Sequence, residues 1–314
     1  MKIATVTLNP AIDQTVSVDN FRTNTVNRGQ SMSLQAGGKG INVASFLVDA
    51  GYAVAATGFL GQDNLEIFER FFALQHINDA FVRIPGSTRT GVKIVDEANI
   101  QTTDINLPGQ MPPQDALDAL LKRIEQLSAS YDWFVLAGSL PPGVPTTIYA
   151  TVIDLLKARG KSITLDTSHD ALHKGVLAGP TIVKPNIDEL QQLVGHILAD
   201  EAAIEQAARQ LLENGSQLVV ISMGEKGAMF VNREASFIAT PPRVPVKSTV
   251  GAGDAMVAGL IVGHIQGLDL PTCARLATAF SIGAITRTDF HLPAVETLQA
   301  YTQQVSVRAY QHSS

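Results

Sequence analysis

A glycine-rich turn at the start of an apolar helix is the part of the sequence best suited to chemistry on an anion. It reads Ser248-Thr249-Val250-Gly251-Ala252-Gly253-Asp254. The first N–H groups of a helix have no partner within it and lie at the positive end of its dipole, so they can bind a phosphoryl group. Asp254 could accept a proton from a hydroxyl that attacks phosphorus. By itself the motif fits equally well a carboxylate that only caps the helix.

A second glycine turn, Ala36-Gly37-Gly38-Lys39-Gly40-Ile41-Asn42, also opens a helix. Lys39 supplies a cation and Asn42 an amide, which suits a hydroxylated or phosphorylated ligand. The alternative is a strand-to-helix turn with a solvated lysine. Near the end of the first predicted strand, Asp13 could accept hydrogen bonds from sugar hydroxyls or cap a turn.

A third candidate is the pair Asn186 and Glu189, three residues apart at a predicted helix start, where they share a face. Mg²⁺ keeps several waters and takes few protein ligands, so one carboxylate acting through water would suffice. The alternative is a capping arrangement in which Glu189 reaches back to the helix start.

The remaining candidates are a turn and two arginines. The turn Ser222-Met223-Gly224-Glu225-Lys226-Gly227 follows a predicted strand and is compatible with nucleotide phosphates or with a plain hairpin. Arg28 and Arg89 could each bind a phosphate with the guanidinium fork, although most isolated arginines are solvated.

Several familiar motifs are incomplete. Gly160-Lys161-Ser162 resembles the end of a P-loop, but Leu155 stands where the first glycine is required. Neither glycine turn completes the dinucleotide fingerprint, because Val43 and Met256 occupy the position of the third glycine. The seven histidines show no metal-ligand spacing.

Composition excludes other classes. A net charge of −6 over 314 residues gives no long-range attraction for nucleic acid or an anionic membrane surface. The single cysteine, Cys273, rules out an intrachain disulfide and is typical of a reducing cytoplasm. The amino terminus reads as a buried strand rather than a targeting segment, and no apolar run reaches the roughly 20 residues that cross a bilayer.

Alternation of short β-branched runs with helical stretches predicts an α/β fold with a mostly parallel sheet. Predicted strands are 53–59, 133–137, 162–166 and 218–222. A helix is predicted over 115–129, where leucines recur at helical spacing after a double proline. Three more helices are predicted at 253–264, at 271–288 and from 295 onward.

Two regions, about 14–34 and 90–107, break this alternation with short polar strand-like runs and no helix between them. They predict a small separate sheet, with 90–95 and 102–106 as a hairpin that closes over a ligand like a lid. The alternative is an edge hairpin of the main sheet. No linker or repeat divides the chain, so residues 1–314 are expected to form one domain plus this lid.

Taken jointly, the motifs resemble the PfkB/ribokinase family of carbohydrate kinases. The resemblance rests on five segments in the family's order and approximate spacing: Asn9-Pro10-Ala11-Ile12-Asp13, Ala36 to Asn42, Gly138-Ser139-Leu140-Pro141-Pro142-Gly143, Lys184-Pro185-Asn186 and Gly251-Ala252-Gly253-Asp254. It implies a three-layer α/β/α ribokinase-like domain with a small β-sheet lid, which often pairs with the lid of another subunit. A homodimer is therefore expected.

The same resemblance implies roles for individual residues. Asp254 would be the general base, and the amides of Gly251, Ala252 and Gly253 the anion hole. The phosphosugar would be held by Asp13, Gly38, Lys39, Asn42, Arg89 and Ser139, together with Arg28. The ATP site would comprise Lys184, Asn186, Ser222, Gly224, Gly227 and Ser248, and Glu189 with Asn186 would hold Mg²⁺ through water.

Softer matches, including Gly58 to Asn64, Arg89-Thr90 and Thr103 to Asn106, are similar to the bacterial branch that phosphorylates fructose 1-phosphate at its C6 hydroxyl. Fructose 6-phosphate and tagatose 6-phosphate remain alternative substrates within the family. From other classes, a non-catalytic sugar-phosphate and nucleotide sensor and a nicotinamide-dependent dehydrogenase remain open.

Overall fold

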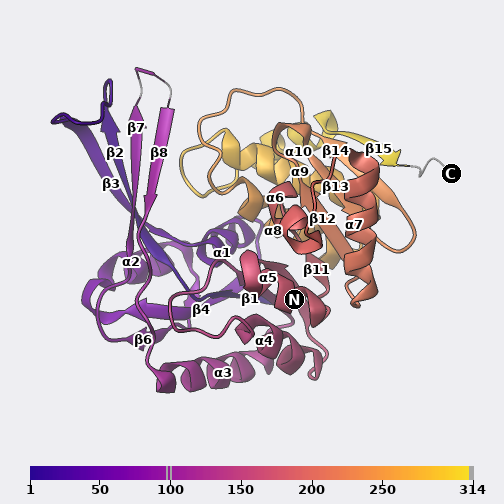
Figure 1. Cartoon of the computed structure of the whole chain (residues 1–314), viewed down its shortest axis with the longest axis horizontal. Helices are drawn as coiled ribbons and strands as arrows, with labels where there is room; N and C mark the ends of the chain where they lie inside the picture. Colours follow the sequence, from indigo (N-terminus) through magenta and orange to yellow (C-terminus); the bar gives the residue numbers. More distant parts are fainter. Residues whose placement is uncertain (97, 100, 311–314) are drawn as a thin grey trace.

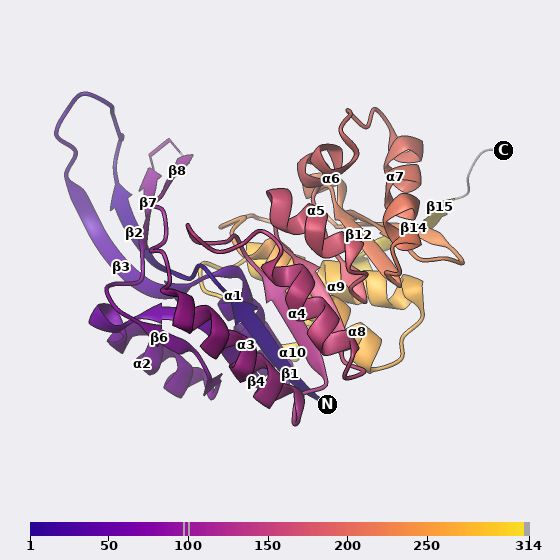
Figure 2. The same cartoon turned by 60° about the horizontal axis from the view of Figure 1, so that its bottom comes forward.

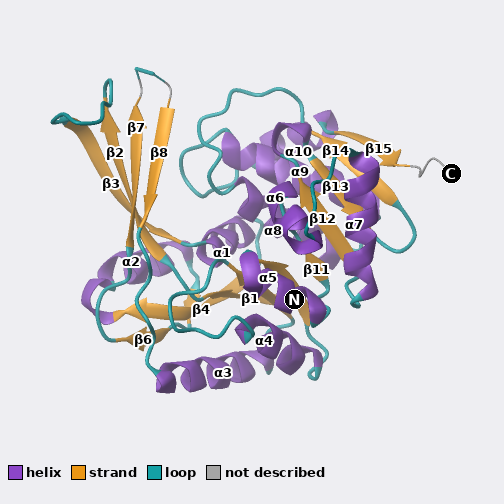
Figure 3. Cartoon of the chain, viewed as in Figure 1, coloured by secondary structure: helices purple, strands orange, loops and turns teal. Residues whose placement is uncertain are grey.

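A large sheet between two layers of helices forms the body of the molecule, and a smaller sheet projects from it (Figures 1 and 3). These observations come from a computed structural model that describes residues 1–96, 98–99 and 101–310. Residues 97 and 100, inside the predicted lid segment 90–107, lie outside the described residues, as do 311–314.

The strands are β1 Lys2–Thr7, β2 Ala11–Val18, β3 Gly29–Gly37, β4 Ala53–Gly61, β5 Asn78–Asp79, β6 Val82–Ile84, β7 Thr90–Asp96, β8 Gln101–Asn106, β9 Trp133–Ala137, β10 Ser162–Asp166, β11 Ile182–Val183, β12 Leu218–Ser222, β13 Ala228–Val231, β14 Ser236–Thr240 and β15 Ser306–Tyr310. The helices are α1 Lys39–Asp49, α2 Glu66–Gln75, α3 Gln114–Ser128, α4 Ile148–Lys157, α5 His169–Leu177, α6 Ile187–Val194, α7 Glu201–Glu213, α8 Ala252–Ile265, α9 Leu270–Ile285 and α10 Val295–Gln304, with short 3₁₀ turns at Gln62–Asn64 and Gly224–Lys226.

The large sheet has the order β15-β14-β13-β12-β11-β10-β9-β1-β4-β5, with β6 also paired to β4. Pairing is parallel from β5 to β12 and antiparallel from β12 to β15. Alternate residues of each central strand enter separate cores. Trp133 and Val135 of β9 pack on the side of α1, α8 and α9, while Phe134 and Leu136 pack on the side of α3 and α4, which Figure 2 brings forward.

The strand order reverses beside β1. The chain runs from β1 through β2, β3 and α1 to β4 on one side, and later returns to place β9 on the other side of β1. The carboxyl ends of parallel strands on either side of such a reversal border a crevice, which is where α/β proteins bind ligands. The ends of β1, β9, β10 and β11 are therefore the expected place for a site.

The smaller sheet has four strands in the order β3-β2-β7-β8. Its β7 and β8 form the predicted hairpin, with Val92 opposite Ile105. It is separate from the large sheet, so the prediction of a separate sheet is confirmed and the alternative of an edge hairpin is wrong. Figure 1 shows it standing away from the body, with the loop between β2 and β3 at its outer end.

Most element predictions agree with the structure. Strands 133–137, 162–166 and 218–222 are found with the predicted bounds, and the predicted helix 115–129 is α3. The three helices predicted after Val250 are α8, α9 and α10, although α9 ends three residues earlier than expected, at Ile285. Strands β13, β14 and β15, in the antiparallel part of the large sheet, were not predicted, and neither were the short strands β5, β6 and β11. Among the described residues, no helix is both long and apolar enough to cross a membrane.

Candidate active site

The glycine turn before α8 has the geometry of an anion site. Gly251 is the N-cap residue with φ 82°, a left-handed conformation that favours glycine, and no side chain caps the helix. The first backbone amides of α8 therefore donate to no capping side chain. Asp254, 5% exposed, does not cap α8. The capping alternative for Asp254 is wrong.

Instead, the carboxylate of Asp254 faces the start of a second helix. Asn42 Nδ2, in the first turn of α1, donates to Asp254 Oδ2 at 2.8 Å. The two glycine turns, more than 200 residues apart in sequence, thus place their helix starts side by side. This hydrogen bond from the Asn42 side chain orients the carboxylate of Asp254.

An ionic bridge joins three of the strand ends and turns. Lys39 Nζ donates to Asp166 Oδ1 at 2.9 Å, and Lys184 Nζ lies 3.4 Å from the other oxygen, Oδ2. Asp166 is the last residue of β10, and Lys184 directly follows β11, so the parallel sheet itself places them together. The side chains of Asp166 and Lys184 are 1% and 4% exposed.

The protonation states of this bridge follow from its surroundings. Burial by itself would raise the pKa of Asp166, but the ammonium groups of Lys184 and Lys39 hold it below its ordinary value. Burial would likewise lower the pKa of Lys39, yet the carboxylates of Asp166 and Asp254 raise it. Asp166 and Lys39 are therefore both charged at neutral pH.

Asp254 has the opposite shift. Burial raises its pKa to about 6, and the charge of Asp166 adds to the increase, while Lys39, Asn42 and Lys184 reduce it. A pKa near the working pH suits a general base, because the group is ionised and still accepts a proton readily. This shift is the kind that marks functional carboxylates.

Lys184 also borders the anion turn. A Cβ on Gly253 would stand 3.3 Å from Lys184 Nζ, so the ammonium group lies against the backbone of the second residue of α8. Helix amides and a fixed ammonium group can stabilise a transferring phosphoryl group. A buried carboxylate beside them can accept the proton of the attacking hydroxyl. The geometry can thus support phosphoryl transfer to a hydroxyl.

Asp13 lies at the base of the small sheet, in β2, between β3 and β7. A Cβ at Gly37 would stand 2.2 Å from its Oδ2, and a Cβ at Gly91 would stand 3.4 Å from its Oδ1. Small neighbours thus leave the carboxylate room beside the turn that carries Gly38, whose φ is 129°. Burial raises the pKa of Asp13, although Lys93 and Arg89 act against it.

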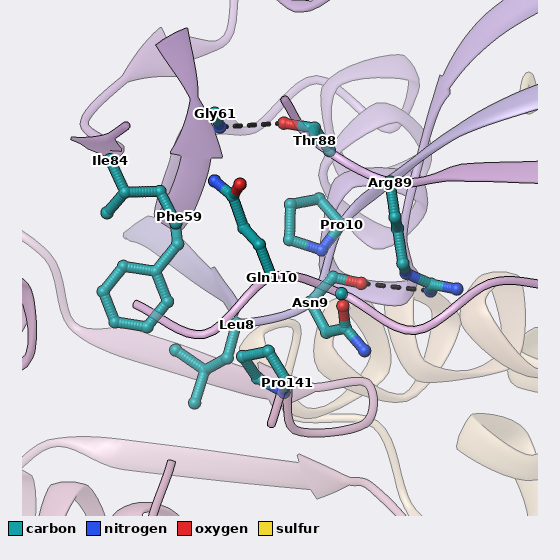
Figure 4. A pocket seen from close by; sticks show the side chains of 11 residues that line it. Leu8, Asn9, Pro10, Phe59, Gly61, Ile84, Thr88, Arg89, Gln110 and Pro141 are labelled. Atoms are coloured by element: carbon teal, nitrogen blue, oxygen red, sulfur yellow. Dashed lines mark hydrogen bonds between the residues drawn. The ribbon is translucent and has the colours of Figure 1, made fainter. Parts of the chain in front are cut away.

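A small hollow at the end of β1 contains Asn9 and Arg89 (Figure 4). Arg89 donates to the carbonyl oxygens of Leu107 and Asn9 at 3.1 and 3.2 Å, and its Nε is buried without a partner. Asn9 Nδ2 donates to Ser139 Oγ at 3.1 Å, which ties the loop after β9 to the end of β1. The charge of Arg89 also acts on the pKa of Asp13, so Arg89 and Asp13 lie near each other.

The predicted nucleotide residues lie along the ends of β11 and β12. Asn186 and Glu189 form a capping box at the start of α6, with Asn186 Oδ1 accepting from Glu189 N at 2.8 Å and Glu189 Oε2 accepting from Asn186 N at 2.9 Å. The capping arrangement considered as the alternative for this pair is therefore found in the structure. The charge of Glu189 nevertheless contributes to the raised pKa of Lys39, so Glu189 lies within electrostatic range of the bridge.

Other predicted residues complete this side or stand apart from it. Ser222 ends β12 beside Asn186, and Gly224 and Gly227 form the turn that follows. Ser248 Oγ accepts from Val250 N at 3.2 Å and so shapes the anion turn. Arg28, in contrast, is exposed just before β3, in the loop at the outer end of the small sheet (Figure 1).

Sequence reasoning did not single out Asp166. Its signal was available, because an acidic residue ends a predicted parallel strand, where ligand-binding groups gather. Within the described residues, no three His, Cys, Asp or Glu side chains cluster as a metal site would require.

Comparison with known proteins decides the family. A model described as "pfkB family carbohydrate kinase" matches residues 6–297. The chain belongs to the PfkB family of carbohydrate kinases. The family resemblance seen in the motifs is thereby confirmed, and with it the class of phosphotransferase enzyme.

Relatives within the PfkB family match the chain over nearly its whole length. A protein named 1-phosphofructokinase from Rhodobacter capsulatus is 47% identical, with 98% of each chain covered, and one of the same name from Vibrio cholerae is 41% identical, with 98% and 97% covered. A solved structure named as a possible 1-phosphofructokinase from Thermotoga maritima has a TM-score of 0.90 at 28% identity, covering 99% and 100% of the two chains. The ribokinase-like fold is thus shown.

The ionic bridge of this PfkB protein makes a stability prediction. Asp166→Asn removes the negative charge between two buried or half-buried ammonium groups, and we expect the free energy of unfolding to fall by about 3 kcal/mol. Urea denaturation measures the change. As a control, Glu201→Gln breaks the exposed pair with Arg308 and should cost less than about 1 kcal/mol. Equal effects of the two substitutions would contradict the assigned weight of the bridge.

Proposed function

We propose that the protein transfers the γ-phosphoryl group of ATP to the C6 hydroxyl of fructose 1-phosphate, giving fructose 1,6-bisphosphate and ADP. The observation that carries the proposal is the position of Asp254. It is a buried carboxylate in the first turn of α8, beside helix amides that no side chain caps and near the ammonium group of Lys184.

In this reaction Asp254 is the general base that takes the proton of the attacking hydroxyl. The amides of Gly251, Ala252 and Gly253 form the anion hole for the charge that develops on the transferring phosphoryl group. Little covalent chemistry is asked of the protein, so positioning and charge stabilisation supply most of the rate enhancement. The bond from Asn42 keeps the carboxylate aimed.

The sugar phosphate lies on the side of the small sheet. Asp13 accepts hydrogen bonds from sugar hydroxyls, while Lys39 and Arg89 supply positive charge to the phosphate. Gly38, Asn42 and Ser139 complete the pocket, whereas Arg28, exposed in the loop between β2 and β3, stands apart from it. Fructose 1-phosphate is favoured because relatives at 41% and 47% identity over the full chain are named 1-phosphofructokinase.

ATP lies on the side of α6 and β12, along Lys184, Asn186, Ser222, Gly224, Gly227 and Ser248. The donor set there fits Mg²⁺ held through water. Glu189 uses Oε2 as an acceptor in the capping box, and because the residue is only half-buried, water can reach its other oxygen. Asn186 borders the same position. Bound Mg²⁺ would neutralise charge on the phosphates of ATP.

The four-stranded sheet acts as the lid of a single 1–314 domain, and we propose that it pairs with the lid of a second subunit in a homodimer. Its outer strands expose apolar side chains, including Met32 and Leu34 of β3 and Ile105 of β8. A solved relative, phosphofructokinase-2 from Escherichia coli, is described as tetrameric in an inhibited form. Two features support a cytoplasmic location. The proposed reaction uses ATP, and the chain has only one cysteine.

Substrate choice is tested by coupled ADP release with fructose 1-phosphate, fructose 6-phosphate and tagatose 6-phosphate. We expect kcat/KM to be highest for fructose 1-phosphate. The second sugar is included because phosphofructokinase-2 from Escherichia coli, with a TM-score of 0.89 at 27% identity, was solved in complex with fructose-6-phosphate. A preference for either other sugar overturns the substrate, and sugar and ATP binding without ADP release favours a sensor.

The role of Asp254 is tested by Asp254→Asn, which keeps the shape of the side chain but removes the proton acceptor. Turnover should fall at least about a hundredfold, while ATP binding measured by calorimetry stays near that of the native protein. Asp269→Asn is the matched control, because Asp269 is the N-cap of α9, away from the site. Near-native turnover in Asp254→Asn would rule out this base.

The raised pKa of Asp254 predicts an acid limb in the pH profile of kcat/KM. The base works only when deprotonated, so activity should rise as pH increases through about 6. Lys39→Met removes a charge that lowers this pKa and should move the limb to higher pH, whereas the exposed Lys122→Met should not. The substrate phosphate titrates equally in all variants, so a limb that does not move in Lys39→Met contradicts the assignment.

A further inference from the structure

The segment that follows α9, residues 287–293, lies against the anion turn. A Cβ on Gly251 would stand 3.0 Å from two ring carbons of Phe290 and 3.8 Å from Cζ of Phe46 in α1. Two aromatic rings thus pack on the glycine that begins α8. A shift of Phe290 would leave the left-handed Gly251 without one of its packing neighbours.

One residue further on, His291 fastens this segment to the end of α1. His291 Nδ1 lies 3.2 and 3.1 Å from the two carboxylate oxygens of Asp49, and the amide N–H of Leu292 donates to Asp49 Oδ2 at 2.7 Å. On the other side of the ring, Gln75 Nε2 of α2 lies 3.1 Å from His291 Nε2. We call the contact of Asp49 with His291 and Leu292 the Asp49 latch.

Helix α9 supports the turn from the other side. Ser281 Oγ donates to the carbonyl oxygen of Ala252 at 2.7 Å, and the amides of Lys247 and Ser248 donate to the carbonyl oxygen of Ile285 at 2.8 and 3.3 Å. These bonds fix α9 to the backbone on both sides of Gly251. The Asp49 latch adds a tie from α1, the helix that carries Lys39 and Asn42 at its start.

We propose that Phe290 is a positioning residue for phosphoryl transfer, and that the Asp49 latch holds its ring against Gly251 so that the amides of the anion turn keep their register with Asn42 and Lys39. The proposal rests on the function proposed above. Neither Phe290 nor the latch is placed in contact with the substrates, so both act through the turn.

The charge on His291 sets the strength of the latch. The hydrogen bond that the His291 ring donates to Asp49 raises the pKa of His291, and burial acts against this. The charges of Asp49 and Asp289 raise the pKa further, while Arg287 lowers it. Gln75, the contact from α2, is neutral. The charge-assisted latch is therefore fully present at low pH and is lost as pH rises through the raised pKa of His291.

Phe290→Ala tests the positioning role. We expect kcat to fall about tenfold while KM for the sugar changes less than about twofold. The substitution displaces the anion turn but not the side chains proposed to bind the sugar. Phe71→Ala is the matched control, since Phe71 is also a half-buried ring packed on the same core but lies in α2. Native kcat in Phe290→Ala, or an equal loss in Phe71→Ala, overturns the proposal.

The latch is tested by Asp49→Asn, His291→Gln and the double variant. Each single change should lower kcat about threefold, and the double variant should lose little more, because both changes break one contact. The ratio of native kcat to His291→Gln kcat should shrink as pH rises. The titration of Asp254 affects both proteins and therefore cancels in this ratio. Additive losses or a constant ratio contradict the latch.

A measurement without turnover separates this inference from the proposed function. By NMR, the pKa of His291 should lie above about 6.5 and return toward that value in Asp49→Asn. The amide signals of Gly251 and Gly253 should move in His291→Gln and stay in place in Phe71→Ala. Unmoved signals overturn the coupling whichever sugar is phosphorylated, and failure of all three sugars in the ADP assay overturns only the function.

Discussion

The buried carboxylate of Asp166 between Lys39 and Lys184 is the contact on which the rest of the site depends. Removing a carboxylate from water is costly, and it stays ionised only because two ammonium groups face it. The arrangement fixes one lysine beside the turn of α1 and the other beside the turn of α8. A single negative charge thereby aligns the side proposed for the sugar with the side proposed for ATP.

This alignment is possible because the fold brings distant segments to one edge. Asp166 and Lys184 come from neighbouring parallel strands, while Lys39 and Asp254 begin helices that pack on the same face of the sheet. The same charges then divide the roles of two buried carboxylates. Asp166, with two cations, keeps a low pKa, whereas burial raises the pKa of Asp254, which suits a proton acceptor.

Much of this could be predicted from the sequence, because apolar runs such as 133–137 fill a buried strand and glycine turns mark helix starts. Strand β15 was missed because its residues 306–310 lie at a sheet edge, where exposed and half-buried positions carry no strong apolar pattern. The bridge was missed for another reason. The value of Asp166 depends on Lys39, 127 positions away, and no local pattern contains that contact.

The most direct measurement of the central claim is a crystal structure with fructose 1-phosphate and a non-hydrolysable ATP analogue. The account predicts that an Asp254 oxygen lies within about 2.6–3.2 Å of the C6 hydroxyl, with the γ-phosphate on the amides of Gly251 to Gly253 and beside Lys184. A complex in which the C6 hydroxyl bonds to another group, or in which the γ-phosphate lies away from the α8 turn, would contradict it.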